Sequence, residues 1–360
     1  MKRNKLLALF TAAVMAATVL SGCGGSANSS LPESSSALET ASDVSSEGSS
    51  EPASAPESSE ASDSIPDVAM SIAGLKGPTG LGMLKMMDGS DAMDSSPYTF
   101  TLAGAAEEVV SKISTGELDI ASVPSNLAAT LWNKTGGGVK VLGVNALGVL
   151  YLVTKGEDVK SLADLNGKTI ISSGKGTTAQ YVFEYLLKQN GIDPETDVTI
   201  DYKTEHADAA TAIASAETAV AVLPQPFVTT VTMQNQDVSI ALDLSAEWEK
   251  ATSKKLPMGV IIGRTEYVEA NPEAVNAFLD QYAASAQYVN ENPAEAAALS
   301  EEYGLIKAAV AEKAIPYCNI VCLEGDEMKA ALSDFLQVLF DYNPQTIGGT
   351  IPSEDFYYTR

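Results

Sequence analysis

Residues 169–187 constrain the fold of this chain more than any other segment. They read as a short apolar strand, a glycine-rich turn and a helix that begins at Thr177 or Thr178, because apolar residues follow the two threonines at helical spacing. The free N–H groups and the dipole at a helix start favour an anionic or strongly polar ligand. Gly174 and Gly176 let the backbone approach such a ligand closely. We therefore expect this turn to form one side of a ligand cleft.

Apolar runs of strand length alternate with helical segments along most of the chain from residue 66. This alternation predicts an α/β fold with largely parallel sheets. Ligands of such sheets bind beyond the carboxyl ends of the strands. The polar segments at those ends are 76–79 and 122–126, and the first of them belongs to a second glycine-rich turn. We expect that turn to form the opposite side of the cleft.

The apolar run 139–153 is longer than a usual strand, and Asn145 and Gly148 interrupt it. This pattern indicates a chain that leaves one lobe and enters another. Asn145 is the most telling residue of the run, because a buried amide needs hydrogen-bond partners. A hinge that faces the cleft would supply them.

The first residues predict export. A segment rich in basic residues, 1–5, precedes the apolar run 6–20, which is too short for a durable membrane span and is typical of a secretory signal. Its ending, Leu-Ser-Gly-Cys23, resembles a bacterial lipobox, which implies cleavage before Cys23 and lipid on its thiol. The alternative is an ordinary cleaved signal. Residues 24–65 are rich in Ser, Glu, Ala and Pro and predict a disordered tether.

The composition excludes several classes of function. The formal net charge of −25 makes nucleic acid a poor partner, because binding phosphates requires a basic face. Cys318 and Cys322 are four residues apart in an extended apolar run, which disfavours a disulfide between them. His206 is the only histidine, and the neighbouring Glu205 and Asp208 read as a solvated helix start. The sequence therefore predicts no metal and no cofactor.

Several segments together resemble the solute-binding proteins of ABC importers, in the NMT1/THI5-like group of taurine, sulfonate, nitrate and thiamine-precursor binders. Besides the lipobox, the resemblance rests on the segments 72–79, 116–126, 161–170, 223–227 and 271–279. Of these, Leu-Ala-Asp-Leu-Asn-Gly-Lys at 162–168 is the most specific. The resemblance covers nearly all of residues 66–360.

This resemblance implies a periplasmic-binding-protein-like fold of type II. Two α/β lobes would be joined by two hinge crossings and would close on one small molecule. The expected division is a signal peptide at 1–22, the lipidated Cys23 and tether at 23–65, the first lobe at 66–148 plus 243–360, and the second lobe at 149–242. The ligand positions of the family map onto Gly77, Pro78, Thr79, Ser125, Asn126, Asn145, Ser173, Gly174, Gly176, Thr177, Thr178 and Gln225.

One departure from the family affects the charge of the ligand. Many relatives carry an acid at the position of Gln225, which hydrogen-bonds but has no charge. A cationic amine in the ligand is therefore less expected. Trp132 and Trp248 are expected to serve in packing rather than in ligand stacking.

Two other classes of function compete with a binding protein. Gly174-x-Gly176-x-x-Ala179 followed by Asp201 fits a loose dinucleotide fingerprint, which would make the chain an exported enzyme. Against it stands the export signal, and Ser173 has no base nearby in sequence. A surface adhesion or sensor lipoprotein is the third possibility. The sequence favours a monomeric receptor that is not an enzyme, is lipid-anchored outside the cytoplasmic membrane, and passes a small polar or anionic solute to ABC permease subunits.

Overall fold

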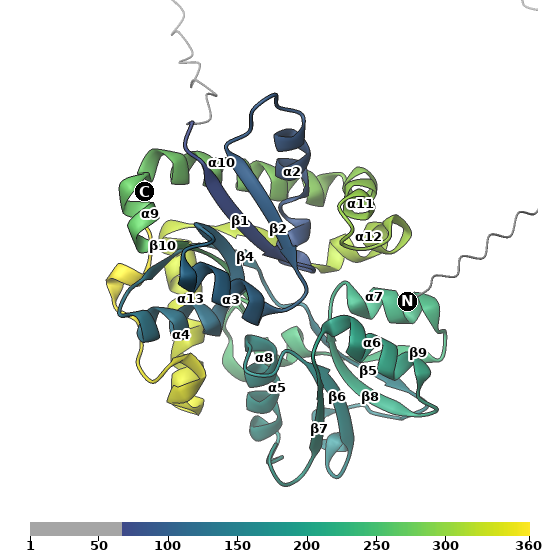
Figure 1. Ribbon diagram of the computed structural model, residues 1–360. Coiled ribbons are helices and arrows are strands. Elements are labelled where there is room, and N and C mark those ends of the chain that lie inside the picture. The colour runs from purple at the N-terminus through teal and green to yellow at the C-terminus, as the bar shows by residue number, and fades with distance from the viewer. Residues whose placement is uncertain (1–66) are drawn as a thin grey trace, which may run out of the picture. The chain divides into compact units, whose positions relative to one another are not determined.

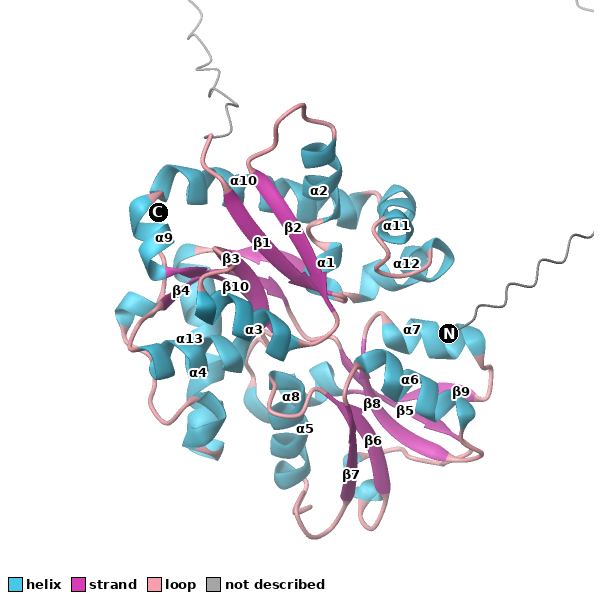
Figure 2. Cartoon of the chain, in the orientation of Figure 1, coloured by secondary structure: helices cyan, strands magenta, loops and turns pink. Residues whose placement is uncertain are grey.

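The computed structural model describes residues 67–360. These residues form two β-sheets, and helices cover both faces of each sheet (Figures 1 and 2). The signal sequence, Cys23 and the tether predicted at 1–65 lie outside the described residues. Within residues 67–360, no helix combines the length and hydrophobicity needed to cross a membrane.

The first sheet has six strands in the order β11-β4-β10-β3-β1-β2. Strand β1 runs parallel to both β2 and β3, whereas β10 runs antiparallel to β3 and β4. Edge strand β11 is antiparallel to β4. The bounds are β1 Met70–Leu75, β2 Tyr98–Ala103, β3 Ile120–Pro124, β4 Val139–Ala146, β10 Gly259–Arg264 and β11 Ile320–Leu323.

The second sheet has five strands in the order β7-β6-β8-β5-β9. Strand β6 is parallel to β7 and β8, and β5 is antiparallel to β8 and β9. The bounds are β5 Leu150–Lys155, β6 Thr169–Ser173, β7 Thr199–Lys203, β8 Ala219–Pro224 and β9 Val238–Asp243. We call each sheet with its covering helices a lobe.

Five of the nine strand pairings are antiparallel, so the prediction of largely parallel sheets is wrong and both sheets are mixed. The C-terminal part of the chain is mainly helical, as the sequence predicts. The α-helices are α1 Pro78–Leu81, α2 Leu84–Asp91, α3 Ala106–Thr115, α4 Ser125–Thr135, α5 Thr178–Gln189, α6 His206–Ser215, α7 Phe227–Gln234, α8 Leu244–Thr252, α9 Thr265–Ala270, α10 Pro272–Glu291, α11 Pro293–Glu302, α12 Ala308–Ala314 and α13 Gly325–Tyr342. Short 3₁₀ turns lie at η1 Leu162–Leu165, η2 Ile315–Tyr317, η3 Pro344–Ile347 and η4 Glu354–Phe356.

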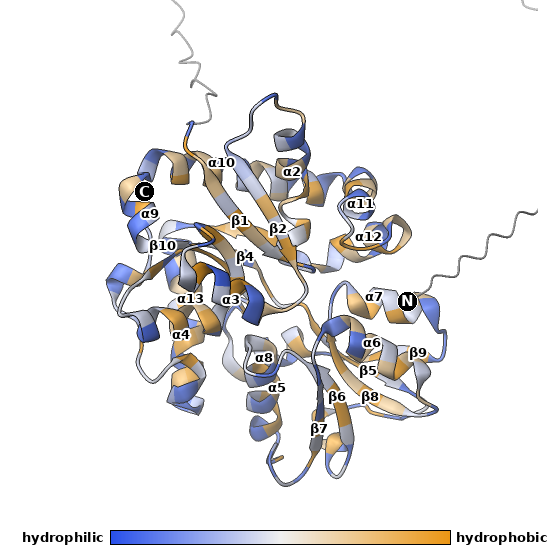
Figure 3. Ribbon diagram, viewed as in Figure 1, coloured by the Kyte–Doolittle hydropathy of each residue, from blue (hydrophilic) through white to orange (hydrophobic). Residues whose placement is uncertain are grey.

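Alternating strand residues divide the first lobe into two cores. Ile72 packs with Phe278 and Tyr282 of α10 on one face, whereas its neighbour Ala73 faces the core built on α3, α4 and α13. Successive side chains of a strand point to opposite faces, so a strand covered on both sides is apolar throughout. Figure 3 shows this for β1, β5 and β8, which are mostly hydrophobic along their length.

Two stretches of chain pass between the sheets. Strand β4 ends at Ala146 in the first sheet and β5 begins at Leu150 in the second, so the run 139–153 divides where Asn145 and Gly148 interrupt it. The return passes from β9 through α8 to β10. Helix α8 packs against α5 and β5 of the second sheet. The two-lobe fold with two crossings is confirmed, while the residue boundaries of the lobes stay a prediction.

Both cysteines among the described residues are free thiols. Cys318 follows the turn η2 rather than lying in a strand, and Cys322 lies in β11. The expectation that both share one extended run is therefore wrong. The break comes at Asn319, whose positive φ of 43° turns the chain into β11.

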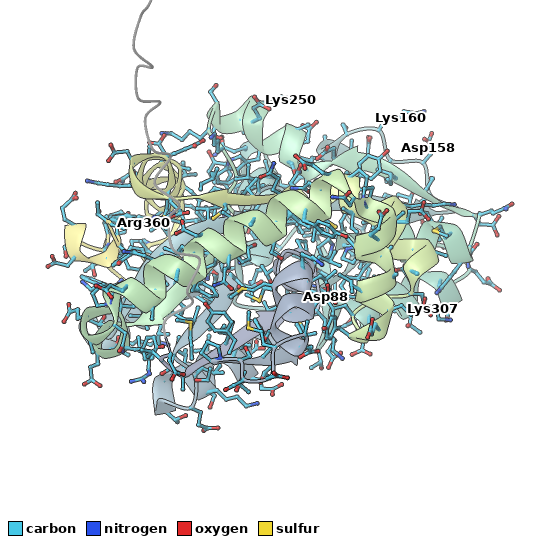
Figure 4. All side chains as sticks on the ribbon, turned by 90° about the horizontal axis from the view of Figure 1, so that it is seen from above. Asp88, Asp158, Lys160, Lys250, Lys307 and Arg360 are labelled. Carbon is cyan, nitrogen blue, oxygen red and sulfur yellow. The ribbon has the colours of Figure 1, made fainter. Side chains whose placement is uncertain are left out.

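Charged side chains gather at the periphery. In Figure 4, Lys160 and Lys250 lie at the outer edge of the described residues. The ion pair between Lys160 and Asp158 illustrates this, because its two side chains are 80% and 78% exposed. Such a pair contributes little to stability. The acidic composition is therefore mainly a property of the solvated surface.

Candidate functional site

A cavity of about 110 Å³ lies between the two lobes, at the carboxyl ends of several strands. One bound water needs at least ~10–15 Å³ of such space, so the cavity has room for a small organic molecule. The first lobe lines it with 75–79, Gly104, Ala106, Pro124, Ala146, Met258 and Gly259. The second lobe, with the crossing residue Val149, lines it with Leu150, 177–179, His206, Pro224, Gln225 and Phe227.

Five helices of eight or more residues begin at this cavity, namely α3, α4, α5, α6 and α7. Pro124 precedes α4, Thr178 and Ala179 open α5, and Phe227 opens α7, and all four residues line the cavity. The first turns of α4, α5 and α7 hold no acidic residue, whereas those of α3 and α6 hold Glu107, Glu108 and Asp208. Some of the N–H groups are already used, because Asn126 of α4 donates to Thr178 Oγ1 and Thr229 of α7 donates to Gln225 Oε1. The N–H groups that open α5, and the dipoles of α4, α5 and α7, are left to favour a negatively charged group.

The side chains at the cavity wall have the same preference. Among the described residues that line the cavity, none is Asp or Glu, and Lys76 is exposed at its edge. Glu205 is the nearest acid on α6, but its side chain lies over Gly104 and forms a capping box with Asp208. The predicted role of Glu205 and Asp208 as a helix start is confirmed. No carboxylate of the described residues therefore forms part of the wall itself.

Half of the twelve predicted ligand residues line the cavity. These six are Gly77, Pro78, Thr79, Thr177, Thr178 and Gln225. The other six lie behind the wall and are Ser125, Asn126, Asn145, Ser173, Gly174 and Gly176. Contact of any of the twelve with a ligand stays a prediction.

Asn126 joins the two lobes. Its Nδ2 donates to the carbonyl of Gly176 at 3.0 Å and to that of Thr346 at 3.1 Å. Thr178 Oγ1 donates to Asn126 Oδ1 at 3.1 Å and accepts from the backbone N–H of Asn126 at 3.2 Å. Asn126 is 1% exposed, so both ends of its amide are used inside the protein. Its neighbour Ser125 is similarly engaged, because its hydroxyl donates to the carbonyl of Pro257.

We expect Asn126→Ala to loosen the start of α5. The change leaves buried groups of Thr178 and Gly176 without partners, which costs roughly 1–3 kcal/mol of unfolding free energy. Urea denaturation measures the loss, and hydrogen exchange at 174–178 should become faster. Asn133→Ala is the matched control, because Asn133 lies on the same helix but bonds only to the carbonyls of Ile347 and Thr350 and to the Thr350 hydroxyl. Equal acceleration at 174–178 in both variants would contradict this role.

Asn145 lies just behind the cavity, at the end of β4. Its Nδ2 donates to Ser122 Oγ at 2.8 Å, while its buried Oδ1 has no partner among residues 67–360. A Cβ atom added to Gly259 would lie 2.8 Å from this oxygen and 2.9 Å from Thr79 Cγ2. Glycine at 259 therefore lets the strand pass closely over Asn145. The predicted hinge position of Asn145 next to the cleft matches this placement.

Ser173 has a base beside it, contrary to the expectation from sequence. Its Oγ lies 2.6 Å from Nδ1 of His206, which is 33 residues away in the chain. Parallel pairing of β6 with β7 brings the start of α6 over the end of β6. The imidazole also packs on the ring of Phe227 at 5.4 Å between centroids. Burial lowers the pKa of His206 to about 4, so the ring is neutral at physiological pH.

Gln225 lies in the cavity wall, whereas the two tryptophans pack elsewhere in the protein. Gln225 Oε1 accepts from the backbone N–H of Thr229 at 3.2 Å and from its hydroxyl at 2.8 Å, so this oxygen is held in place. Trp248 is fully buried between Tyr185 and Phe335, and Trp132 packs on Phe356. Neither tryptophan lines the cavity. The expected packing role of both is confirmed.

Part of the dinucleotide fingerprint is engaged within the protein. The N–H of Gly176 donates to Gln180 Oε1 at 2.6 Å, and the carbonyl of Gly176 is bound by Asn126. Asp201, the acid of the fingerprint, forms an ion pair with Lys203 at 2.7 Å. Within the described residues, no three or more His, Cys, Asp or Glu side chains are placed to hold a metal ion.

Solved structures define the class of this fold as that of periplasmic binding proteins. An ABC transporter from Parabacteroides distasonis is 22% identical, with a TM-score of 0.68 over 81% of this chain and 99% of its own. The alkanesulfonate-binding protein SsuA from Xanthomonas axonopodis pv. citri, bound to MOPS, is 15% identical, with a TM-score of 0.63 over 79% and 95%. The aliphatic sulphonate binding protein SsuA from Escherichia coli is 19% identical, with a TM-score of 0.62 over 79% and 92%.

The resemblance found in the sequence agrees with a match to a family model over part of the chain. Residues 139–296 match the model of the family described as NMT1/THI5 like. Relatives from Brucella abortus and Brucella suis, described only as binding proteins, are 25% identical over 194 residues. That match spans 54% of this chain and 58% of each relative's length.

Proposed function

We propose that this protein is the solute-binding component of an ABC importer and that it captures a small organic anion between its two lobes. The observation that carries the proposal is the cavity at which α4, α5 and α7 begin. The first N–H groups of α5 and α7 supply hydrogen-bond donors, and no Asp or Glu is among the described residues that line the cavity. Fixed donors bind an oxyanion without having to reorganise.

A sulfonate is the first anion to test. Two structural relatives are sulfonate-binding proteins, and one of them is bound to MOPS. The wall combines the donors of the helix starts with the apolar surfaces of Leu150, Met258 and Phe227. A ligand with an anionic head and an apolar body would satisfy both parts of this wall. The polar part of the wall would orient the ligand, and the apolar part would increase its affinity.

Closure of the lobes would couple capture to delivery. The bonds between Asn126 and the start of α5 connect the lobes next to the cavity. A ligand that touches both lobes favours the closed arrangement by its extra contacts there. The closed protein would then dock on permease subunits as a monomer. Delivery needs no chemical step, so this proposal includes no enzymatic activity.

The N-terminal segment would place this receptor outside the cytoplasmic membrane. The signal at 1–22 directs export, Cys23 carries the lipid, and 24–65 forms the tether. Fatty-acid labelling of cells that express the native chain or Cys23→Ser tests the anchor. Label that persists in Cys23→Ser would refute it.

Native mass spectrometry of the protein, purified without denaturation, tests the proposed function. We expect an organic anion at one copy per chain, or binding of MOPS, ethanesulfonate or acetate in calorimetry. The panel also includes methylammonium as a cationic probe and NAD. A protein that binds only the cation, or that carries a dinucleotide or turns over its bound molecule, would contradict the proposal. A bound dinucleotide, or turnover of the bound molecule, would favour an exported enzyme with the same cleft as the function of this protein.

A further inference from the structure

We infer that Ser173 fixes the tautomer of His206 and that His206 thereby presents an uncharged Nε2–H donor to the ligand in the cavity. The subsite would take an acceptor oxygen of a sulfonate, carboxylate or carbonyl group. This inference deepens the proposed function and rests on it for the identity of the ligand. The tautomer itself is a property of the protein alone.

The geometry places the two ring nitrogens in different surroundings. Nδ1 lies 2.6 Å from Ser173 Oγ, and His206 lines the cavity. Nε2 makes no hydrogen bond within the described part of the chain and is not enclosed by protein. One nitrogen is thus turned into the lobe, and the other is left for a ligand.

The hydroxyl of Ser173 decides which nitrogen carries the proton. Ser173 is 2% exposed, and its Oγ has Nδ1 of His206 as its single hydrogen-bond partner among residues 67–360. If Nδ1 carried the proton, the Ser173 hydroxyl hydrogen would be buried without an acceptor, which is unfavourable. If the hydroxyl donates to Nδ1, the proton of the neutral ring is on Nε2. The second arrangement satisfies every polar group, so Nε2 becomes a donor.

A neutral donor fits the rest of this wall. The first backbone N–H groups of α5 and α7 are donors as well, and no carboxylate lines the cavity within the described residues. Phe227 supports one face of the imidazole at 5.4 Å between ring centroids. The ring is therefore held by a hydrogen bond and by packing. A fixed donor of this kind selects ligands by the position of their acceptor oxygen.

Nitrogen-15 NMR of the full chain tests the tautomer directly, because His206 is the only histidine. At neutral pH we expect a pyrrole-type shift for Nε2 and a pyridine-type shift for Nδ1. Ser173→Ala should convert this single state into a mixture of tautomers, while Ser172→Ala, also in β6, should leave it unchanged. A proton on Nδ1 in the native protein, or equal mixing of tautomers, overturns the inference whether or not a ligand is known.

Calorimetry with MOPS tests the contact. His206→Phe keeps an aromatic ring but removes the donor, and we expect about tenfold weaker binding, as for loss of one hydrogen bond to a charged group. Addition of MOPS should also shift the Nε2 resonance of the native protein. Unchanged affinity in His206→Phe, together with an unmoved Nε2 signal, refutes the ligand contact. If MOPS does not bind the native protein, the sulfonate proposal fails, and the NMR result alone decides the tautomer.

Discussion

Replacement of Ala106 by aspartate should weaken binding of an organic anion about a hundredfold. Ala106 is the first residue of α3, is 8% exposed and lines the cavity. Aspartate suits a helix start, so the fold should accept it. A carboxylate about 5 Å from the bound anion opposes it by roughly 3 kcal/mol at an effective dielectric constant of ~20, which corresponds to a factor on the order of 100. Calorimetry with MOPS, or with the anion that co-purifies, measures the change.

Ala106→Asn is the matched control for this result. Asparagine has nearly the size of aspartate and lacks its charge, so we expect it to weaken binding far less. The loss in the aspartate variant should also shrink as salt is added, because ions screen charges near the surface. Equal losses in both variants would mean that space, not charge, controls the site. Stronger binding in the aspartate variant would mean that the ligand is a cation.

The sequence predicts most of what is local in this site. The strand, glycine turn and helix at 169–189 follow from apolar spacing and helix-start residues, and β6 and α5 lie there. The crossing near Asn145 is likewise visible as a polar interruption in an apolar run. In both segments the secondary structure depends on residues that are close together in the sequence, so the sequence pattern predicts it.

Features that depend on distant pairs could not be predicted in this way. His206 becomes part of the wall because parallel pairing of β6 and β7 brings Ser173 beneath it, across 33 residues. Asn126 is predicted to bind ligand, and the structure adds a hydrogen bond between its amide and Thr178, which lies 52 residues further along the chain. A polar residue at a helix start can form hydrogen bonds with a ligand or with the other lobe. Only the packing of the lobes separates these two uses.

Acid should destabilise the native protein through His206 more than it destabilises His206→Asn. Burial lowers the pKa of His206 to about 4, compared with the ordinary value of 6.5, and burial is the one cause of the shift. Between these values the unfolded chain binds the proton and the folded protein does not, so stability falls as pH falls. The full contribution is present above pH 6.5, and on the order of 3 kcal/mol is lost by about pH 4.

Urea denaturation of both proteins at several pH values measures this contribution. Other groups that titrate in the same range are common to the two proteins, including the carboxylates of Glu205 and Asp208 on α6, so the difference between the curves isolates the imidazole. We expect the native protein to lose stability relative to His206→Asn from pH 6.5 down to 4, and the difference to be constant outside that window. Parallel curves throughout would mean that the ring takes up a proton as easily folded as unfolded. The imidazole would then be solvated and charged in acid, and the low pKa attributed to its burial would be wrong.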